Sequence, residues 1–172
     1  GERIQHLEET SPGTGATQPA ALLSATGIFD SLASLQVVSG FIEYAVNQPF
    51  WSDGTVKRRW VAMPDTSEIE FSAVDAWQFP LGTVVVKHFE IALIENDPGS
   101  QRRLETRLLI LTDSGWQGFT YRWNVQQTDA DLLSGREQES ISVQLADGSS
   151  REQIYEYPSR TDCLVCHTAV AG

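Results

Sequence analysis

Two cysteines and a histidine near the C-terminus form the densest group of chemically active residues in the chain. They occur in the order Cys163-Leu164-Val165-Cys166-His167, which is the C-x-x-C-H spacing of covalent haem attachment. Two thiols three residues apart on one local turn can reach the two vinyl-derived carbons on one edge of a porphyrin, and the next residue then directs its imidazole toward the iron. We therefore predict one covalent haem c with His167 as the proximal iron ligand.

Other interpretations of the same residues stay open. A thioredoxin-like redox pair shares the C-x-x-C spacing, but such a pair normally follows a strand and opens a long helix, and only five residues follow His167 here. Cys163 and Cys166 could instead form a small disulfide loop. A zinc site would need two further ligands from His6, His88 or carboxylates, and two cysteines exclude a four-thiolate zinc site.

A second axial ligand to the iron has several candidates. His88 lies within a run of β-branched residues, which would hold its imidazole rigidly, and Met63 is the only methionine. Lys87, and after it Lys57, would have to lose a proton before binding iron. Each of these residues also has an ordinary structural interpretation, and an open or water-ligated iron is a further alternative. The choice matters because methionine ligation raises the reduction potential relative to two histidines.

Residues around these candidates have weaker signals. Arg160, just before the cysteines, is a candidate partner for a haem propionate or else a solvated arginine. Glu105 and Arg107 fall on one face of a predicted strand, so we expect a structural ion pair. Several large aromatic residues would wall a porphyrin or, in our preferred interpretation, fill the core: Trp60, Trp77, Trp116, Tyr121 and Trp123.

The composition limits the classes of function. The chain has 172 residues, a length typical of one domain with a real core. Twelve Lys and Arg against 23 Asp and Glu give a net charge of −11, which disfavours nucleic acid and anionic membranes and favours a partner with a basic patch. No apolar run approaches the roughly 18–20 residues of a membrane span. Residues 1–7 show no signal-peptide pattern, and we expect the chain to be a module of a larger protein.

The pattern along the chain predicts a mainly β fold. Residues 1–20 are interpreted as a flexible tail or linker, and residues 21–172 as one β-rich haem domain. A short helix is expected within 24–35 and a helical turn at 129–133. Turn residues at 113–115 and 147–148 predict two hairpins. We therefore expect an antiparallel sandwich, jelly-roll-like or barrel-like, with strands at 41–46, 56–63, 67–71, 83–94, 104–112, 116–123, 140–145 and 151–157.

Seven segments after the tail resemble a family of bacterial secreted c-type haem domains whose function is uncharacterised. The family pattern runs from an early L-S-x-T-G-L-F to a final P-S-R-x-x-C-x-x-C-H. The matching segments here are LLSATGIF at 22–29, PFWSDGTVKRRW at 49–60, WQFPLGTVVVKHF at 77–89, ETRLL at 105–109, GWQGFTYRWN at 115–124, DADLL at 129–133 and PSRTDCLVCH at 158–167.

The resemblance implies haem attachment at Cys163 and Cys166 and iron ligation by His167. The family usually has leucine at the position of Met63 and varies at that of His88, while its V-K-x-F lysine matches Lys87. Its chains continue past the cysteines. Such domains are fused to cytochrome, quinoprotein or carbohydrate-binding modules, and the resemblance implies electron supply to copper-dependent polysaccharide-degrading enzymes.

These observations together predict a monohaem electron-transfer domain rather than an enzyme. The iron would cycle between ferric and ferrous, and the domain would be periplasmic, secreted or on the cell surface, where covalent haem attachment occurs. Two alternatives remain: a carbohydrate-binding sandwich with exposed tryptophans and a small disulfide loop, and an enzyme with an open haem site.

Overall fold

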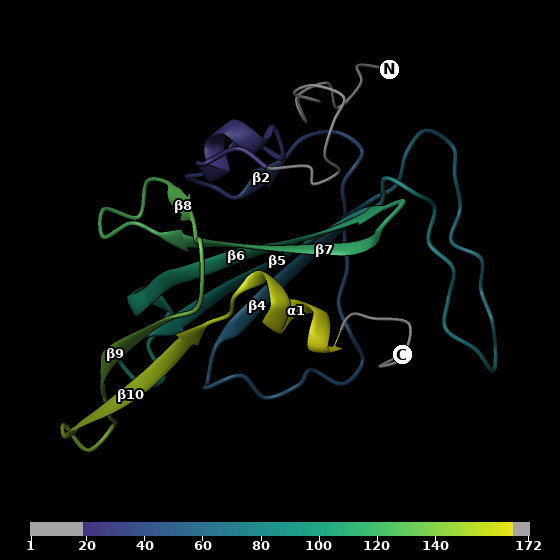
Figure 1. Cartoon of the computed structure of the whole chain (residues 1–172). Helices are drawn as coiled ribbons and strands as arrows, with labels where there is room; N and C mark the ends of the chain where they lie inside the picture. The colour runs from purple at the N-terminus through teal and green to yellow at the C-terminus, as the bar shows by residue number, and fades with distance from the viewer. Residues whose placement is uncertain (1–18, 167–172) are drawn as a thin grey trace.

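The computed structural model describes residues 19–166, apart from the side chain of Cys166, and shows a mainly β, antiparallel fold. One six-stranded sheet forms the middle layer, with smaller elements on both of its faces (Figure 1). Within the described residues, no helix is long and apolar enough to cross a membrane. The strand order is β3 (Ile42–Glu43), β4 (Val56–Ala62), β5 (Val84–Ala92), β6 (Gln101–Thr112), β7 (Gly115–Trp123) and β8 (Ala130–Leu132).

The long strands form where apolar and polar residues alternate, because successive side chains of a strand point to opposite faces of the sheet. β6 and β7 pair directly after the turn at 113–115, where Gly115 adopts a positive φ of 94° that suits glycine. Register shifts between Phe89 and Glu90, where β5 pairs with β6. This bulge turns the far ends of both strands relative to their middle parts.

The two faces of the sheet differ in composition. The face that lies away from the C-terminal helix is here called the opposite face. Its apolar side chains pack under η1 (Leu23–Thr26) and under the pair of strands β1 (Phe29–Ser31) and β2 (Gln36–Val37). These elements lie above the sheet in Figure 1. The core of this layer consists of Leu23, Ile28, Phe29, Leu35, Trp60, Val84, Val86, Leu108, Ile110, Phe119, Tyr121, Trp123 and Ala130.

The other face, here called the α1 face, is covered by the helix α1 (Arg160–Cys166) and by a ribbon of β9 (Glu137–Gln144) and β10 (Ser150–Tyr157). The ribbon packs at the bulged end of the sheet, where Ile91 and Leu104 meet Ile141, Val143 and two tyrosines. It lies below the sheet in Figure 1, beside α1. A second short 3-10 turn, η2 (Pro98–Ser100), connects β5 to β6.

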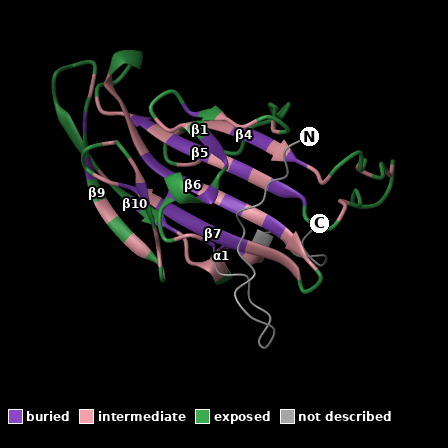
Figure 2. Ribbon diagram, turned by 90° about the horizontal axis from the view of Figure 1, so that it is seen from above, coloured by how far each residue is buried: buried purple, intermediate pink, exposed green. Residues whose placement is uncertain are grey.

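The prediction of a mainly β antiparallel fold is confirmed, and a ribbon facing a larger sheet is compatible with a sandwich. Both predicted hairpins are present, at 113–115 and at 147–148. Figure 2 shows buried and less buried residues alternating along the central strands. Residues 1–18, most of the predicted tail, lie outside the described part of the chain.

Three local predictions were wrong. The helix expected within 24–35 is reduced to Leu23–Thr26, because Gly27 adopts a left-handed conformation and the chain then enters β1. The helical turn expected at 129–133 is the strand β8, which pairs with the end of β7. The strand expected at 67–71 is only a single bridge between Glu70 and Gln78.

Candidate functional site

The helix that carries the cysteines begins with a local capping arrangement. The Ser159 side chain accepts a hydrogen bond from the Asp162 backbone N–H at 3.3 Å, and the Asp162 carboxylate accepts from the Ser159 backbone N–H at 2.8 Å. This reciprocal pattern satisfies two amide groups at the start of the helix. Pro158 stands immediately before it in sequence, which disfavours helix at the preceding residue. The sequence itself therefore sets where α1 starts.

An ion pair with a distant part of the chain helps to orient α1. Arg136, just before β9, donates two hydrogen bonds to the Asp162 carboxylate, at 3.1 and 2.5 Å. These bonds, with those from Ser159, hold the pKa of Asp162 well below its usual range. The first turn of α1 is therefore stabilised both by its capping hydrogen bonds and by an ion pair with the residue that precedes β9.

Close contact between α1 and β7 depends on a glycine. A Cβ placed on Gly118 would lie 2.5 Å from the Cβ of Cys163 and 3.0 Å from its Sγ. No side chain larger than hydrogen fits in that space without movement of the helix. Cys163 is 8 % exposed, and burial raises the pKa of its thiol although the nearby Arg107 opposes this. The thiol therefore lies between the helix and the α1 face.

Three cationic side chains lie side by side on the α1 face of the sheet. Register places Arg59 of β4 opposite Lys87 of β5, and Lys87 opposite Arg107 of β6. We call these three residues the cation row. The next position across the sheet is Thr120 on β7, two residues beyond Gly118. The cation row thus leads across the α1 face toward Cys163.

The cation row has few compensating charges. Neither Arg59, which is 9 % exposed, nor Lys87 forms an ion pair with a carboxylate of the described residues. Lys57, two residues before Arg59, donates a hydrogen bond to the Phe50 carbonyl. Burial, followed by repulsion from Arg107, Arg59 and Lys57, lowers the pKa of Lys87 to about 8. Like charges directly across strands are destabilising, so this arrangement is not explained by stability of the sheet.

One carboxylate, Glu105, stands beside the cation row. It is fully buried, bonds the Arg107 guanidinium as predicted, and accepts a hydrogen bond from the Tyr155 hydroxyl at 2.6 Å. Its other oxygen, Oε2, and the Nε of Arg107 are buried without a hydrogen-bond partner among the described residues. Buried polar atoms normally have partners. Both atoms belong to the Glu105–Arg107 ion pair, which therefore leaves one acceptor and one donor available to a further polar group.

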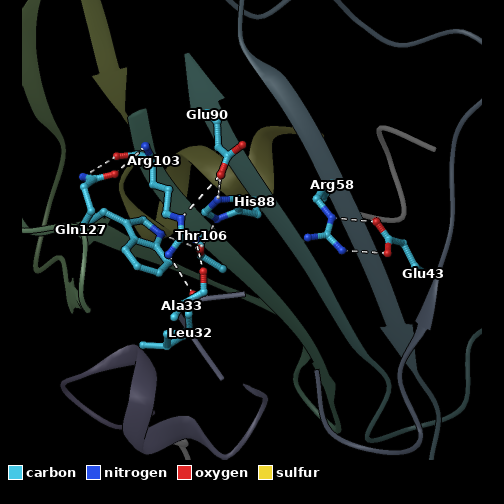
Figure 3. A network of polar contacts seen from close by, with 10 residues as sticks. Leu32, Ala33, Glu43, Arg58, His88, Glu90, Arg103, Thr106 and Gln127 are labelled. Carbon is cyan, nitrogen blue, oxygen red and sulfur yellow. Dashed lines mark hydrogen bonds and ion pairs between the residues drawn. The ribbon is translucent and has the colours of Figure 1, made fainter. Parts of the chain in front are cut away.

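His88 lies on the opposite face. Its ring bonds Thr106 Oγ1 at 2.8 Å and Glu90 at 3.2 Å, and it packs edge-on against Trp123. Figure 3 shows His88 and Thr106 with Arg103, which reaches Glu90 and the backbone oxygens of Leu32 and Ala33. Burial lowers the pKa of His88. Because neighbouring residues of a strand alternate, His88 faces away from Cys163 while Lys87 shares its face.

The remaining predicted site residues are distributed as follows. Met63 lies one residue beyond β4 and is partly buried. The guanidinium of Arg160 lies 4.2 Å from the centre of the Phe119 ring, a cation–π contact. Cys166 ends α1, and its side chain, like all of His167 and His6, falls outside the described residues.

The large aromatic residues divide between core and surface. Trp60, Tyr121 and Trp123 are at most 3 % exposed and lie in the core, as expected. Trp77 is instead 52 % exposed and packs edge-on against Phe71. Trp116 packs on Phe79. Two neighbouring residues of the loop before β4, Phe50 and Trp51, are largely exposed.

Sequence reasoning missed the cation row as a unit. Arg59 was not singled out, and Lys87 and Arg107 were assigned separate roles. A signal was present in the strand at 56–62, where Lys57 and Arg59 are spaced by two and so share a face. Their alignment with Lys87 and Arg107 depends on strand register, which the sequence pattern did not supply.

Among the described residues, no group of three or more His, Cys, Asp or Glu side chains is placed to hold a metal ion. Comparison with known proteins gave no match to a family model, a curated protein or a solved structure.

Proposed function

We propose that this domain is a monohaem c-type electron-transfer module, with haem bound through Cys163 and Cys166 and the iron bound by His167. The observation that carries the proposal is the C-x-x-C-H spacing, whose two cysteines both belong to the short helix packed on the α1 face. When bound, haem supplies one-electron chemistry at its iron. No chemistry on a substrate is required.

The residues present fit such a group. Haem combines an apolar ring with two carboxylates, and the α1 face beside Cys163 has both kinds of partner. Val85 and Leu109, cross-strand neighbours that are only partly buried, provide apolar surface next to Gly118, and the cation row provides positive charge. The unpartnered Nε of Arg107 provides a donor.

The protein would contribute position and electrostatics. The capping bonds of Ser159, the Arg136–Asp162 pair and the contact at Gly118 hold α1 at one place on the sheet. A fixed attachment point keeps the distance and orientation for electron transfer constant. The cations next to it favour added negative charge, so they favour the reduced state.

The distal side of the iron remains a prediction. Of the two strand candidates, Lys87 shares a face with Cys163 and His88 does not. His88 also uses both ring nitrogens in hydrogen bonds, so binding iron would break one of them. This placement argues against His88 and leaves Lys87, Met63 or an open position for the spectra to decide.

We further propose an extracytoplasmic module of a larger protein, with a redox partner that presents a basic patch. Covalent haem attachment outside the cytoplasm gives the location, and the net charge of −11 gives the partner chemistry. An oxidative, copper-dependent polysaccharide-degrading enzyme is the recipient we propose from the sequence resemblance. Higher salt should slow electron transfer to such a partner.

The test is expression with a periplasmic haem-attachment system. We expect a red protein whose mass exceeds that of the bare polypeptide by one haem, whose haem survives acid-acetone extraction and which titrates as a one-electron couple. Cys163→Ala and Cys166→Ala should each lose one thioether bond, and the double variant should lose covalent haem. Arg151→Ala, in an exposed part of β10, is the control. A colourless protein of bare mass contradicts the proposal.

A second candidate, carbohydrate binding, is favoured by the surface aromatics. Trp51 is 80 % exposed and Trp77 52 %, and exposed rings of this size are commonly part of a binding surface. Affinity electrophoresis in gels containing soluble polysaccharides measures such binding. Retardation that is lost in Trp51→Ala, in a protein without haem, would replace the first proposal by this one.

A further inference from the structure

The cation row is costly in a protein without a ligand there. Arg59, Lys87 and Arg107 follow one another across three strands, and each like-charged pair is a direct cross-strand neighbour. Six arginines among the described residues have carboxylate partners, including Arg107 with Glu105. In a chain with 23 acidic residues, carboxylates are abundant, yet Arg59 and Lys87 form no ion pair with a carboxylate within residues 19–166. This pattern suits an anion that arrives from outside the polypeptide.

The donors available there suit carboxylates in particular. Arg107 keeps a buried Nε without a partner, and Arg59 is nearly buried with its guanidinium uncommitted to any described carboxylate. Planar guanidinium groups recognise carboxylates through paired hydrogen bonds. Lys87 adds a compact charge between the two arginines, and lies 5.1 Å from the centre of the Phe89 ring. The row therefore combines two forked donors with a central point charge.

We propose that Arg59, Lys87 and Arg107 hold the two propionate groups of the covalent haem. The inference rests on the function proposed above, because the carboxylates belong to a group attached at Cys163, whose helix packs beside Thr120 at the end of the row. It differs from the sequence analysis, in which Arg160 was the candidate partner for a propionate. Arg160 instead has its guanidinium over the Phe119 ring.

The experiment uses the haem-loaded protein and removes the positive charges one at a time. Arg59→Met and Lys87→Met take charge from the cation row. Arg58→Met takes the same charge from the neighbouring position of β4, on the opposite face, where Arg58 pairs with Glu43 at 2.9 Å. Arg59→Lys keeps the charge without the fork, and Lys87→Gln serves if the methionine variant does not fold.

Two measurements report on the propionates. The propionate bending band in the resonance Raman spectrum should shift in Arg59→Met and Lys87→Met and stay unchanged in Arg58→Met. The reduction potential should fall in the same two variants, by roughly tenfold in the redox equilibrium, which is about 59 mV for one electron. Arg59→Lys should keep most of the potential but shift the band.

Three other outcomes would each contradict a different part of the proposal. Normal covalent haem with an unshifted band in the Arg59→Met, Lys87→Met double variant places the propionates elsewhere, and the proposed function survives. Loss of a low-spin six-coordinate spectrum in Lys87→Met makes Lys87 an iron ligand and removes it from the row. If the wild-type protein carries no covalent haem, both the function and this inference are wrong.

Discussion

The two faces of the central sheet differ in whether their cationic side chains have acceptors. On the opposite face, Arg58 pairs with Glu43, and Arg103 reaches Glu90 and two backbone oxygens, so each cation has an acceptor (Figure 3). On the α1 face, Arg59 and Lys87 stand beside each other without a carboxylate among the described residues. Arg58 and Arg59, adjacent residues of β4, belong one to each arrangement.

This difference favours a structural role for the paired cations and, as proposed above, a ligand-binding role for the cation row. Satisfied polar networks stabilise a core, whereas adjacent like charges reduce stability and persist where they serve another purpose. The paired cations of the opposite face are therefore assigned to stability, and the cation row of the α1 face is the part that we propose as the site. Three experiments test this division.

The largest effect is expected at the contact between α1 and the sheet. Gly118→Ala places a Cβ 2.5 Å from that of Cys163, so helix or strand must shift. Overpacking of this kind costs about 2 kcal/mol of unfolding free energy. Denaturant unfolding measures it, and the haem yield should fall as well. Gly135→Ala, with open space around its Cβ, is the control and should change neither quantity. Equal stability of the two variants would show that α1 is not packed as described.

The second-largest effect is expected from two substitutions at neighbouring residues that lie on different faces of the sheet. His88→Gln on the opposite face weakens the bonds to Thr106 and Glu90, and we expect a loss of about 1 kcal/mol in unfolding free energy with an unchanged haem spectrum. Lys87→Met, its neighbour in sequence, should not lower the stability of the haem-free chain, because it removes repulsion within the cation row. A changed electron paramagnetic resonance spectrum in His88→Gln would mean that the imidazole reaches the iron after all.

The smallest effect is a dependence of stability on pH. In the folded chain the pKa of Lys87 is about 8, against 10.5 as its ordinary value, so between these values the unfolded chain binds more protons. Stability of the Cys163→Ala, Cys166→Ala double variant, which cannot hold covalent haem, should therefore rise from about pH 8 to 10. Above pH 10 the raised pKa values of buried tyrosines such as Tyr155 act in the other direction.

Addition of Lys87→Met to that double variant should flatten the rise, and urea unfolding at several pH values measures it. Lys57, whose pKa is also lowered, mainly by burial, leaves a residual slope. The haem-loaded protein should show a flatter profile too, because carboxylates beside Lys87 raise its pKa. A slope that persists unchanged in the Lys87→Met variant would assign it to other groups.

Local sequence signals predicted the long strands and both hairpins, because alternation and turn residues act over short distances. They failed where a distant partner decides the structure. The residues 129–133 resemble a helical turn in isolation, but Ala130–Leu132 pairs with Tyr121–Trp123 as β8. Gly27, with φ of 71°, ended the expected helix early. Both failures come from tertiary pairing or backbone geometry that apolar spacing does not encode.

The site was predictable in part for the same reason. The cysteine spacing and the Glu105–Arg107 pair are local, and the second is confirmed. The cation row depends on the register of β4 with β5, which aligns Arg59 with Lys87, and on the register of β5 with β6, which aligns Lys87 with Arg107; both follow only from the folded sheet. The same register decides that Lys87 and His88, adjacent in sequence, serve different faces.

Uncompensated positive groups on one side of an acidic molecule also give it a permanent electric dipole. The net charge is −11, yet Lys57, Arg59 and Lys87 gather on a single surface. An external field or a charged neighbour therefore exerts a torque on the domain as well as a pull. Carboxylates bound at the cation row would cancel much of that moment, so loading the domain would change how it turns during an encounter as well as its colour.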